Sequence, residues 1–169
     1  MATGGQYQVY ISRWEPATQS AAAGWGTWKE LEDTYPGLKY KSCEGLETQG
    51  EPKFYTEDYA ETSQPRAFLT DKVKENDITL ELLFMDVPAQ GQTAAVSRFS
   101  TYSSFLSFIT GRRFKFYDSE RKIVRDMFLS GEAELSESKF YGGRKYFIAA
   151  FPCTSLNTPD LTGPTSDNS

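Results

Sequence analysis

The sequence predicts a mainly β protein, an antiparallel β-sandwich or split barrel with one flanking α-helix at about residues 92–110. Two observations indicate this class. Only one long segment has a helical period, and most other apolar residues alternate with polar ones over short stretches that end at turn residues. The 169 residues are enough for a single domain, expected at residues 1–153, with a flexible C-terminal tail at residues 154–169.

The segments before the helix are predicted to be strands separated by turns. Val9 and Ile11 alternate with polar residues and indicate a first strand that ends before Pro16. Further strands are expected at residues 28–31, 38–43, 66–70 and 78–85. The last of these, ITLELLFM, has the strongest alternation and is followed by Pro88, which ends it.

Residues 44–64, EGLETQGEPKFYTEDYAETSQ, predict a long acidic loop. A loop of about twenty residues inside a compact domain is uncommon and tends to be functional. Phe54, Tyr55 and Tyr59 are embedded in it, and these aromatic side chains require a covering surface. A neighbouring subunit is one candidate for that cover.

The helix is predicted within QTAAVSRFSTYSSFLSFITGRR, residues 92–113. Apolar side chains recur there at spacings of three and four and therefore share one helical face: Ala95, Phe99, Tyr102, Leu106 and Ile109, with Phe105 and Phe108 beside them. Thr93 is the expected N-cap, and Gly111 the residue that ends the helix. Such a wide aromatic face requires a sheet or a barrel opening against it.

Two hairpins are predicted after the helix. Residues 114–117 and 123–130 are joined by a polar turn, and residues 132–140 and 145–152 are joined at Gly142-Gly143. The last strand has apolar residues on both faces, which is typical of a strand covered on both sides. In total we expect about seven to nine strands.

The tryptophans and the cysteines allow different interpretations. Trp14, Trp25 and Trp28 are compatible with a stacking platform for carbohydrate or nucleotide, or with packing at a subunit interface or under a loop. Cys43 and Cys153 lie far apart in the sequence, and no basic, apolar leader precedes them. We expect both thiols to be reduced and buried near strand ends.

No pattern in the sequence indicates catalysis, a metal or a cofactor. The chain has no histidine and no CxxC motif, and no helix follows the Gly142-Gly143 turn to hold an anion. The acidic pairs Glu132 with Glu134 and Glu57 with Asp58 are of a kind that occurs by chance, although a hydrolase would need such a pair. We therefore expect no enzyme and no cofactor. No apolar run is long enough to span a membrane.

The segment at residues 112–117 alternates basic and aromatic side chains. Such residues can hold single-stranded nucleic acid on a small barrel: Arg112, Arg113, Phe114, Lys115, Phe116 and Tyr117. We favour a simpler interpretation, because alternate residues of a strand point to opposite faces. In it, Phe114 and Phe116 point into the core, and Arg113 and Lys115 point to solvent.

Charge is unevenly distributed along the chain. The net charge is −5, which argues weakly against a general affinity for DNA. Residues 44–81 contain ten acidic residues against four basic ones, whereas residues 112–125 contain six basic residues against two acidic ones. This division is compatible with two solvated loops, or with attraction between neighbouring copies in a ring.

From residue 69 to residue 154 the chain has a long strand, a Pro/Gly break, the helix RFSTYSSFLSFITGRRF, the hairpin FKFYD-SER-KIVRDMFLSGEAEL and the strand GGRKYFIAAFPC. This order resembles the tail-tube and distal-tail family of tailed bacteriophages. The resemblance implies a β-sandwich or split barrel with one flanking helix, and hexameric rings that stack into a tube or hub through which DNA passes. The N-terminal third departs from the family pattern, so tube subunit, distal ring and connector all stay open.

We therefore expect a structural subunit of a phage or prophage tail, present in the virion tail and assembled in the bacterial cytoplasm. Its expected partners are copies of itself and other tail proteins, while DNA passes without specific binding. The predicted subunit interface comprises Phe54, Tyr55, Glu57, Asp58, Tyr59, Arg112, Arg113, Arg121, Lys122 and Arg125. The alternative is a monomeric β-barrel binding module for single-stranded nucleic acid or carbohydrate, which would use the tryptophans or residues 112–117.

Overall fold

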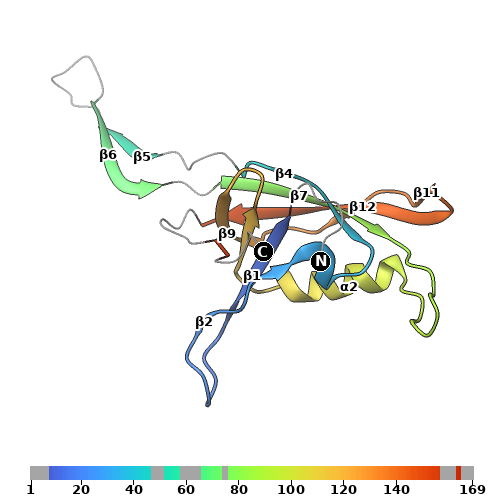
Figure 1. Cartoon of the computed structure of the whole chain (residues 1–169). Coiled ribbons are helices and arrows are strands. Elements are labelled where there is room, and N and C mark those ends of the chain that lie inside the picture. Colours follow the sequence, from blue (N-terminus) through green and yellow to red (C-terminus); the bar gives the residue numbers. More distant parts are fainter. Residues whose placement is uncertain (1–7, 47–51, 58–65, 74–75, 157–162, 165–169) are drawn as a thin grey trace.

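The computed structural model describes residues 8–46, 52–57, 66–73, 76–156 and 163–164. Its elements, in chain order, are β1 (Val9–Glu15), β2 (Gly24–Trp25), β3 (Lys29–Glu30), α1 (Leu31–Thr34), β4 (Leu38–Glu44), β5 (Pro52–Glu57), β6 (Arg66–Val73), β7 (Asn76–Met85), α2 (Arg98–Ile109), β8 (Phe114–Asp118), β9 (Ile123–Leu129), β10 (Glu134–Leu135), β11 (Lys139–Tyr141) and β12 (Arg144–Ser155). The predicted mainly β class is confirmed (Figure 1).

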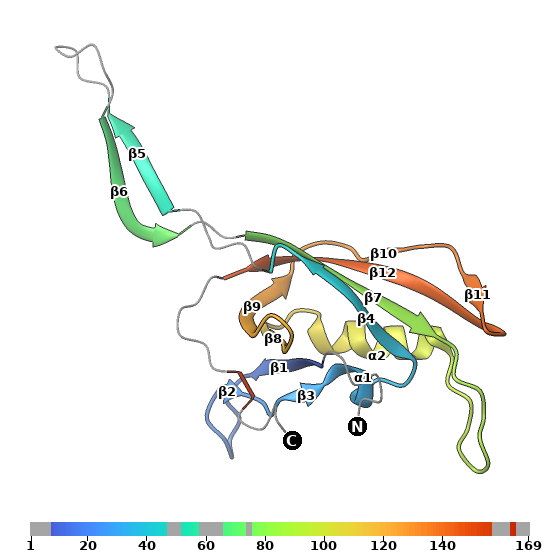
Figure 2. The same ribbon diagram turned by 45° about the horizontal axis from the view of Figure 1, so that its top comes forward.

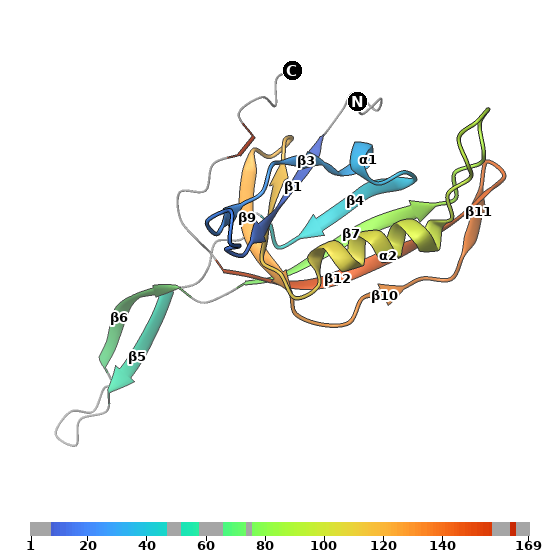
Figure 3. The same cartoon turned by 90° about the horizontal axis from the view of Figure 1, so that it is seen from below.

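The described strands form one ten-stranded antiparallel sheet and one separate two-stranded sheet. The main path of the large sheet is β2-β1-β8-β9-β12-β7-β4, with β10 and β11 on the edge of β12 and β3 on β1. Its central pair is β7 with β12, in register from Asn76 opposite Ser155 to Met85 opposite Tyr146. Because β9 pairs only with the last three residues of β12, the β1-β8-β9 part of the sheet turns away from the β4-β7-β12 part (Figure 3).

The core lies between these two parts of the sheet and against α2. The rings of Tyr40 on β4 and Phe116 on β8 are 5.8 Å apart, which shows that the two ends of the sheet face each other. On the helix side, Phe84 of β7 is fully buried and lies 5.7 Å from Phe147 of β12 and 6.3 Å from Phe105 of α2. Alternating apolar residues on β7 and β12 thus produce one aromatic core face, as their period predicts.

Helix α2 begins later than predicted. Residues 87–96 instead form an extended loop, held by bridges between Val87 and Val96 and between Gln90 and Thr93. Ser97, not Thr93, is the N-cap, and its hydroxyl accepts a hydrogen bond from the Phe99 amide. The expected end is confirmed, because Gly111 follows the helix with a φ of +70°, a conformation that suits glycine.

The predicted apolar face of α2 is largely confirmed, because Tyr102, Leu106 and Phe108 pack partly buried against the core beside the fully buried residues of the helix. Thr101, Phe105 and Ile109 are buried, whereas Phe99 is 50% exposed, and Ala95 lies outside the helix. The Thr101 hydroxyl donates a 2.8 Å hydrogen bond to the Pro36 carbonyl, which places this helix face against the chain between α1 and β4. Neither helix in the described part of the chain is long and apolar enough to cross a membrane.

Two further differences concern strand boundaries. The predicted strand at residues 132–140 is broken into β10 and β11 around Ser136, whose amide donates to the Ile148 carbonyl at 2.9 Å and whose hydroxyl accepts from the Ile148 amide at 2.9 Å. Strand β12 continues to Ser155, a buried residue within the segment expected to be a tail. The Gly142-Gly143 hairpin turn is confirmed, and both glycines have positive φ angles of 58° and 78°.

Candidate subunit interface

The predicted acidic loop contains a strand. Strand β5 lies inside residues 44–64 and pairs with β6, so the expectation of a continuous loop there is wrong. Phe54, Tyr55 and Glu57 lie on β5, with Cα partners Leu69, Phe68 and Arg66 on β6. The sequence PKFYTE has the aromatic and β-branched residues that favour a strand, but the surrounding Gly and Glu obscured this signal. Asp58 and Tyr59 lie outside the described residues.

The β5-β6 hairpin stands away from the large sheet (Figures 1 and 2). It is a sheet of two strands, and neither strand pairs with the described strands of the large sheet. An isolated two-stranded hairpin is only marginally stable in water. This hairpin is therefore the element of the chain that would gain most from contact with another molecule.

Three of the five predicted basic interface residues are paired within the chain. The Arg112 guanidinium donates to the Glu15 carboxylate at 2.9 Å, and Arg113 donates two hydrogen bonds to Asp126, at 3.0 and 2.7 Å. Arg121 lies 3.8 Å from the Asp118 carboxylate and donates to the Cys43 carbonyl at 3.3 Å. Their charges are largely compensated by these acids, which reduces the attraction that they can exert on a neighbour.

The other two basic residues lie on the β8-β9 hairpin. Lys122 is exposed in the turn and has a φ of +57°. The Arg125 guanidinium donates to the Val124 carbonyl at 3.0 Å. Arg112 and Arg113 precede β8, whereas Arg121 and Lys122 lie at the other end of this hairpin. The structure therefore divides the predicted basic surface into two groups.

The three tryptophans lie together over the outer face of β8. Trp14 on β1 and Trp25 on β2 are Cα partners, with ring centroids 5.1 Å apart. The Arg113 guanidinium lies 5.3 Å from the Trp14 ring and 5.0 Å from the Trp25 ring. The Lys115 ammonium lies 4.7 Å from the rings of both Trp25 and Trp28. These are cation–π distances, so the indole rings already have cationic partners from their own chain.

This cluster corrects the interpretation of β8. Phe114 and Phe116 point into the core as expected, but Lys115 is only 8% exposed and does not point to free solvent. All five residues of β8 are buried, because the chain from Trp25 to Trp28 returns across the second face of the strand. Burial lowers the pKa of Lys115, while the nearby Asp126 carboxylate acts in the opposite direction.

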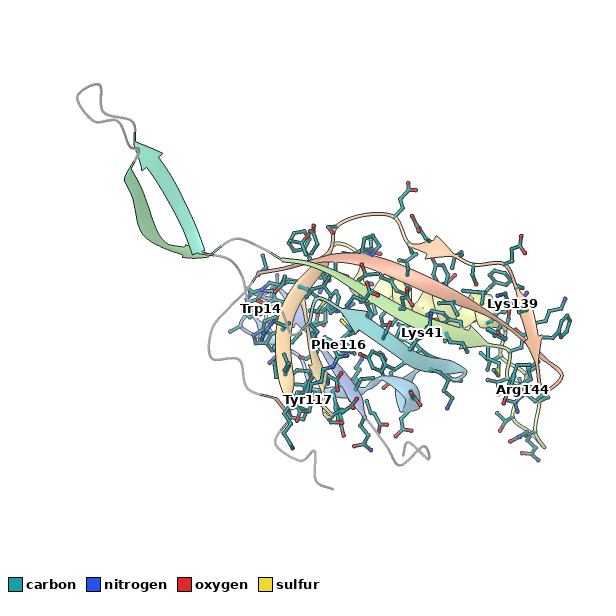
Figure 4. The ribbon with its side chains drawn as sticks, turned by 90° about the horizontal axis from the view of Figure 1, so that it is seen from above. Trp14, Lys41, Phe116, Tyr117, Lys139 and Arg144 are labelled. Atoms are coloured by element: carbon teal, nitrogen blue, oxygen red, sulfur yellow. The ribbon has the colours of Figure 1, made fainter. Side chains whose placement is uncertain are left out.

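The sequence patterns did not predict a further exposed surface, which lies at the end of β7 and β12 away from the β5-β6 hairpin. Its most exposed apolar side chains are Phe140 and Tyr141 on β11, at 70% and 73%. Phe140 borders a groove of about 660 Å³ between residues 86–98 and the β11-β12 turn. Figure 4 shows Lys139 and Arg144 at this end of the molecule, far from Trp14. The sequence contained a signal for this surface, because Phe140 and Tyr141 are adjacent aromatic residues directly before the Gly142-Gly143 turn, which exposes the residues next to it.

Asp86 and Arg98 both line this groove and are joined by hydrogen bonds. The Asp86 carboxylate accepts hydrogen bonds from the Arg98 amide at 2.8 Å and from its guanidinium at 3.2 and 3.0 Å. The backbone hydrogen bond from Arg98 is the main cause of a lowered pKa for Asp86. Arg98 also donates to the Ser138 hydroxyl, which links the start of α2 to the β10-β11 connection.

The described part of the chain contains no group of three or more Cys, Asp or Glu side chains placed to hold a metal ion. Cys43 and Cys153 are buried and unbonded to each other, as expected. Their strands lie on opposite sides of β7, too far apart for a disulfide. Comparison with protein-family models and with curated proteins finds no match to this chain.

Proposed function

We propose that this chain is a non-enzymatic structural subunit of a phage or prophage tail that assembles with copies of itself into a ring or tube. One observation carries the proposal: the β5-β6 hairpin extends from the large sheet and pairs with none of its described strands (Figure 2). A protruding hairpin with Phe54 and Tyr55 in its sequence is suited to pack on a neighbouring subunit. The order of elements that resembles tail proteins gives the class of assembly, with six copies per ring.

The proposal includes partners and a location. Copies of this chain and other tail proteins would be the partners, with assembly in the bacterial cytoplasm and residence in the virion tail. The net charge of −5 suits a passage along which DNA moves without binding, because a negative wall does not retain phosphates. The acidic segment at residues 44–64, which contains β5, is the part proposed to meet a neighbour.

Solution mass and electron microscopy test this proposal. Light scattering of the full chain over a wide range of concentrations, at low and high salt, should show particles of about six times the 19.1 kDa protomer mass. Negative-stain images should show rings or tubes. A mass of 19.1 kDa at every concentration and salt, without rings or tubes, would contradict self-assembly.

The second candidate, a monomeric binding module for single-stranded nucleic acid or carbohydrate, is favoured by the clustering of Trp14, Trp25 and Trp28 beside Arg113 and Lys115. It ranks second because those two cations already contact the indoles and Arg113 pairs with Asp126. Titration of tryptophan fluorescence with oligonucleotides and oligosaccharides separates the candidates. Saturable quenching by micromolar ligand would support the module, and an unchanged spectrum would support the subunit.

A further inference from the structure

The groove beside β11 has an apolar wall and a basic rim. Its lining residues are Asp86, Val87, Pro88, Ala95, Val96, Ser97, Arg98, Phe140, Gly143, Arg144 and Lys145. Val87 and Val96 bridge to each other and so hold the extended loop in a hairpin-like form that makes one wall. On the other wall, the Lys145 ammonium lies 5.2 Å from the Phe140 ring and keeps that ring at the rim.

Three exposed apolar side chains lie on the same face as this groove. Phe140 is the Cα partner of Lys145, and Leu135 is the partner of Ala149, so both share the sheet face of the buried Phe147. Phe99 of α2 contacts that face too, with its ring 5.1 Å from Phe147. Phe99, Leu135 and Phe140 are 50%, 46% and 70% exposed. Exposed apolar side chains gathered on one face make this surface a candidate for contact with another macromolecule.

The hairpin and the groove of one copy cannot meet. Strand β7 begins at Asn76, next to the β5-β6 hairpin in the chain, and ends at Met85, immediately before the groove residue Asp86. Ten strand residues span roughly 30 Å. In Figure 2 the hairpin extends from one end of β7 while β11 and the loop of residues 86–97 lie at the other. Any contact between them therefore requires a second copy.

Charge supports that contact through one part of the hairpin segment. Residues 52–73 have four acidic and three basic residues in all, but residues 54–65 have three acidic residues and no basic one. At the groove, Arg144 forms no ion pair with the described residues. The predicted basic partner at residues 112–125 is less suited, because Arg112, Arg113 and Arg121 already hold acids of their own chain.

The geometry points to a head-to-tail contact, in which the groove lined by Phe140 and Arg144 receives the β5-β6 hairpin of a second copy. This inference rests on the proposed self-assembly and identifies the surface that completes it. Because two different patches meet, the contact is heterologous and repeats from copy to copy. It links copies in series, whether the series closes into a ring or stacks along a tube.

Two complementary variants test the contact. The groove variant Phe140→Ser/Arg144→Glu retains its hairpin, and a second variant with residues 52–73 replaced by a Gly-Ser linker retains its groove. Each variant alone should be monomeric. Their equimolar mixture should form a dimer, in which the intact hairpin of the groove variant binds the intact groove of the linker variant. The dimer should not grow, because no second intact hairpin and groove are left to meet. Unchanged thermal unfolding confirms folding. If the linker variant does not fold, Phe54→Asp/Tyr55→Asp serves in its place.

Matched controls separate this contact from general adhesion. Tyr141→Ser removes an adjacent aromatic of equal exposure that does not line the groove, and Lys122→Glu reverses a charge on the β8-β9 turn. We expect Phe140→Ser to weaken self-association by about 30-fold, equivalent to about 2 kcal/mol, and both controls to change it by less than about threefold.

The outcomes distinguish the two proposals. Wild-type assembly that persists in the groove variant, or that is weakened equally by Tyr141→Ser, overturns the groove contact and leaves self-assembly in place. A larger effect of Lys122→Glu than of Phe140→Ser assigns the contact to the β8-β9 turn and also overturns it. A wild-type protein that stays monomeric, with no dimer in the mixture, overturns both.

Discussion

Replacement of Arg113 by Met should destabilise the protein by about 3 kcal/mol, because it leaves the buried Asp126 carboxylate without its main partner. The Asp126 side chain has no solvent exposure and accepts hydrogen bonds from Arg113 at 3.0 and 2.7 Å. Removal of one member of a buried pair typically costs about 3–5 kcal/mol. The lower end applies here, since the Lys115 ammonium is close enough to interact with Asp126 and Arg113 is 36% exposed.

Arg112 supplies the matched control for this prediction. It is the adjacent residue, has the same charge, and pairs with Glu15 at 2.9 Å, but both side chains of that pair are about 40% exposed. Exposed ion pairs contribute about 0–1 kcal/mol. Arg112→Met should therefore destabilise the protein by less than about 1 kcal/mol.

A double-mutant cycle shows whether the loss at Arg113 comes from the unpaired charge. Asp126→Leu in the Arg113→Met background removes that charge, so the double variant should regain about 2 kcal/mol relative to Arg113→Met. Urea unfolding gives the free energies, with fluorescence of the neighbouring Trp14 and Trp25 and far-ultraviolet circular dichroism as two probes. A loss below about 1 kcal/mol for Arg113→Met, or no recovery in the double variant, would refute the reasoning.

Three further predictions concern the core and α2. Burial raises the pKa of Cys43 and Cys153 to about 12, so the folded thiols stay protonated while the unfolded ones ionise above pH 9. The free energy of unfolding should therefore fall by about 1 kcal/mol per thiol between pH 9 and pH 10. Urea unfolding of the double variant Cys43→Ala/Cys153→Ala over the same pH range should show a smaller fall than the wild type. Phe84→Ala should destabilise by about 3–5 kcal/mol in urea unfolding, since the fully buried ring contacts four other aromatic rings, and a loss under about 1 kcal/mol would contradict this packing. Ser97→Ala should lower the thermal midpoint and reduce the free energy of unfolding by about 1 kcal/mol, because it removes the N-cap of α2. Thr93→Ala should leave the midpoint unchanged. A larger effect of Thr93→Ala than of Ser97→Ala would show that Thr93 is the N-cap.

The sequence determined the features that depend on local pattern. The alternation at residues 78–85 is strand β7, the aromatic helical period is α2, and Gly111 and Gly142-Gly143 are the expected helix end and hairpin turn. These features follow from backbone geometry, because side-chain period and positive φ are properties of a few consecutive residues. The burial and reduced state of both cysteines were also foreseen, since neither thiol has a partner close in sequence.

The cover over each sheet face depends on long-range contacts that a local pattern does not contain. Lys115 has the alternation of a solvent-facing residue, yet it is buried because Trp25 and Trp28, almost ninety residues earlier, return across β8. Phe140 has the same residue type as the core phenylalanines, yet it is 70% exposed, because β11 lies at the edge of the sheet and the Lys145 ammonium, 5.2 Å from the ring centroid, covers little of the ring. The alternation of residues along a strand predicts the sheet face to which each side chain points. Burial of that side chain depends on whether a segment distant in sequence packs on the same face.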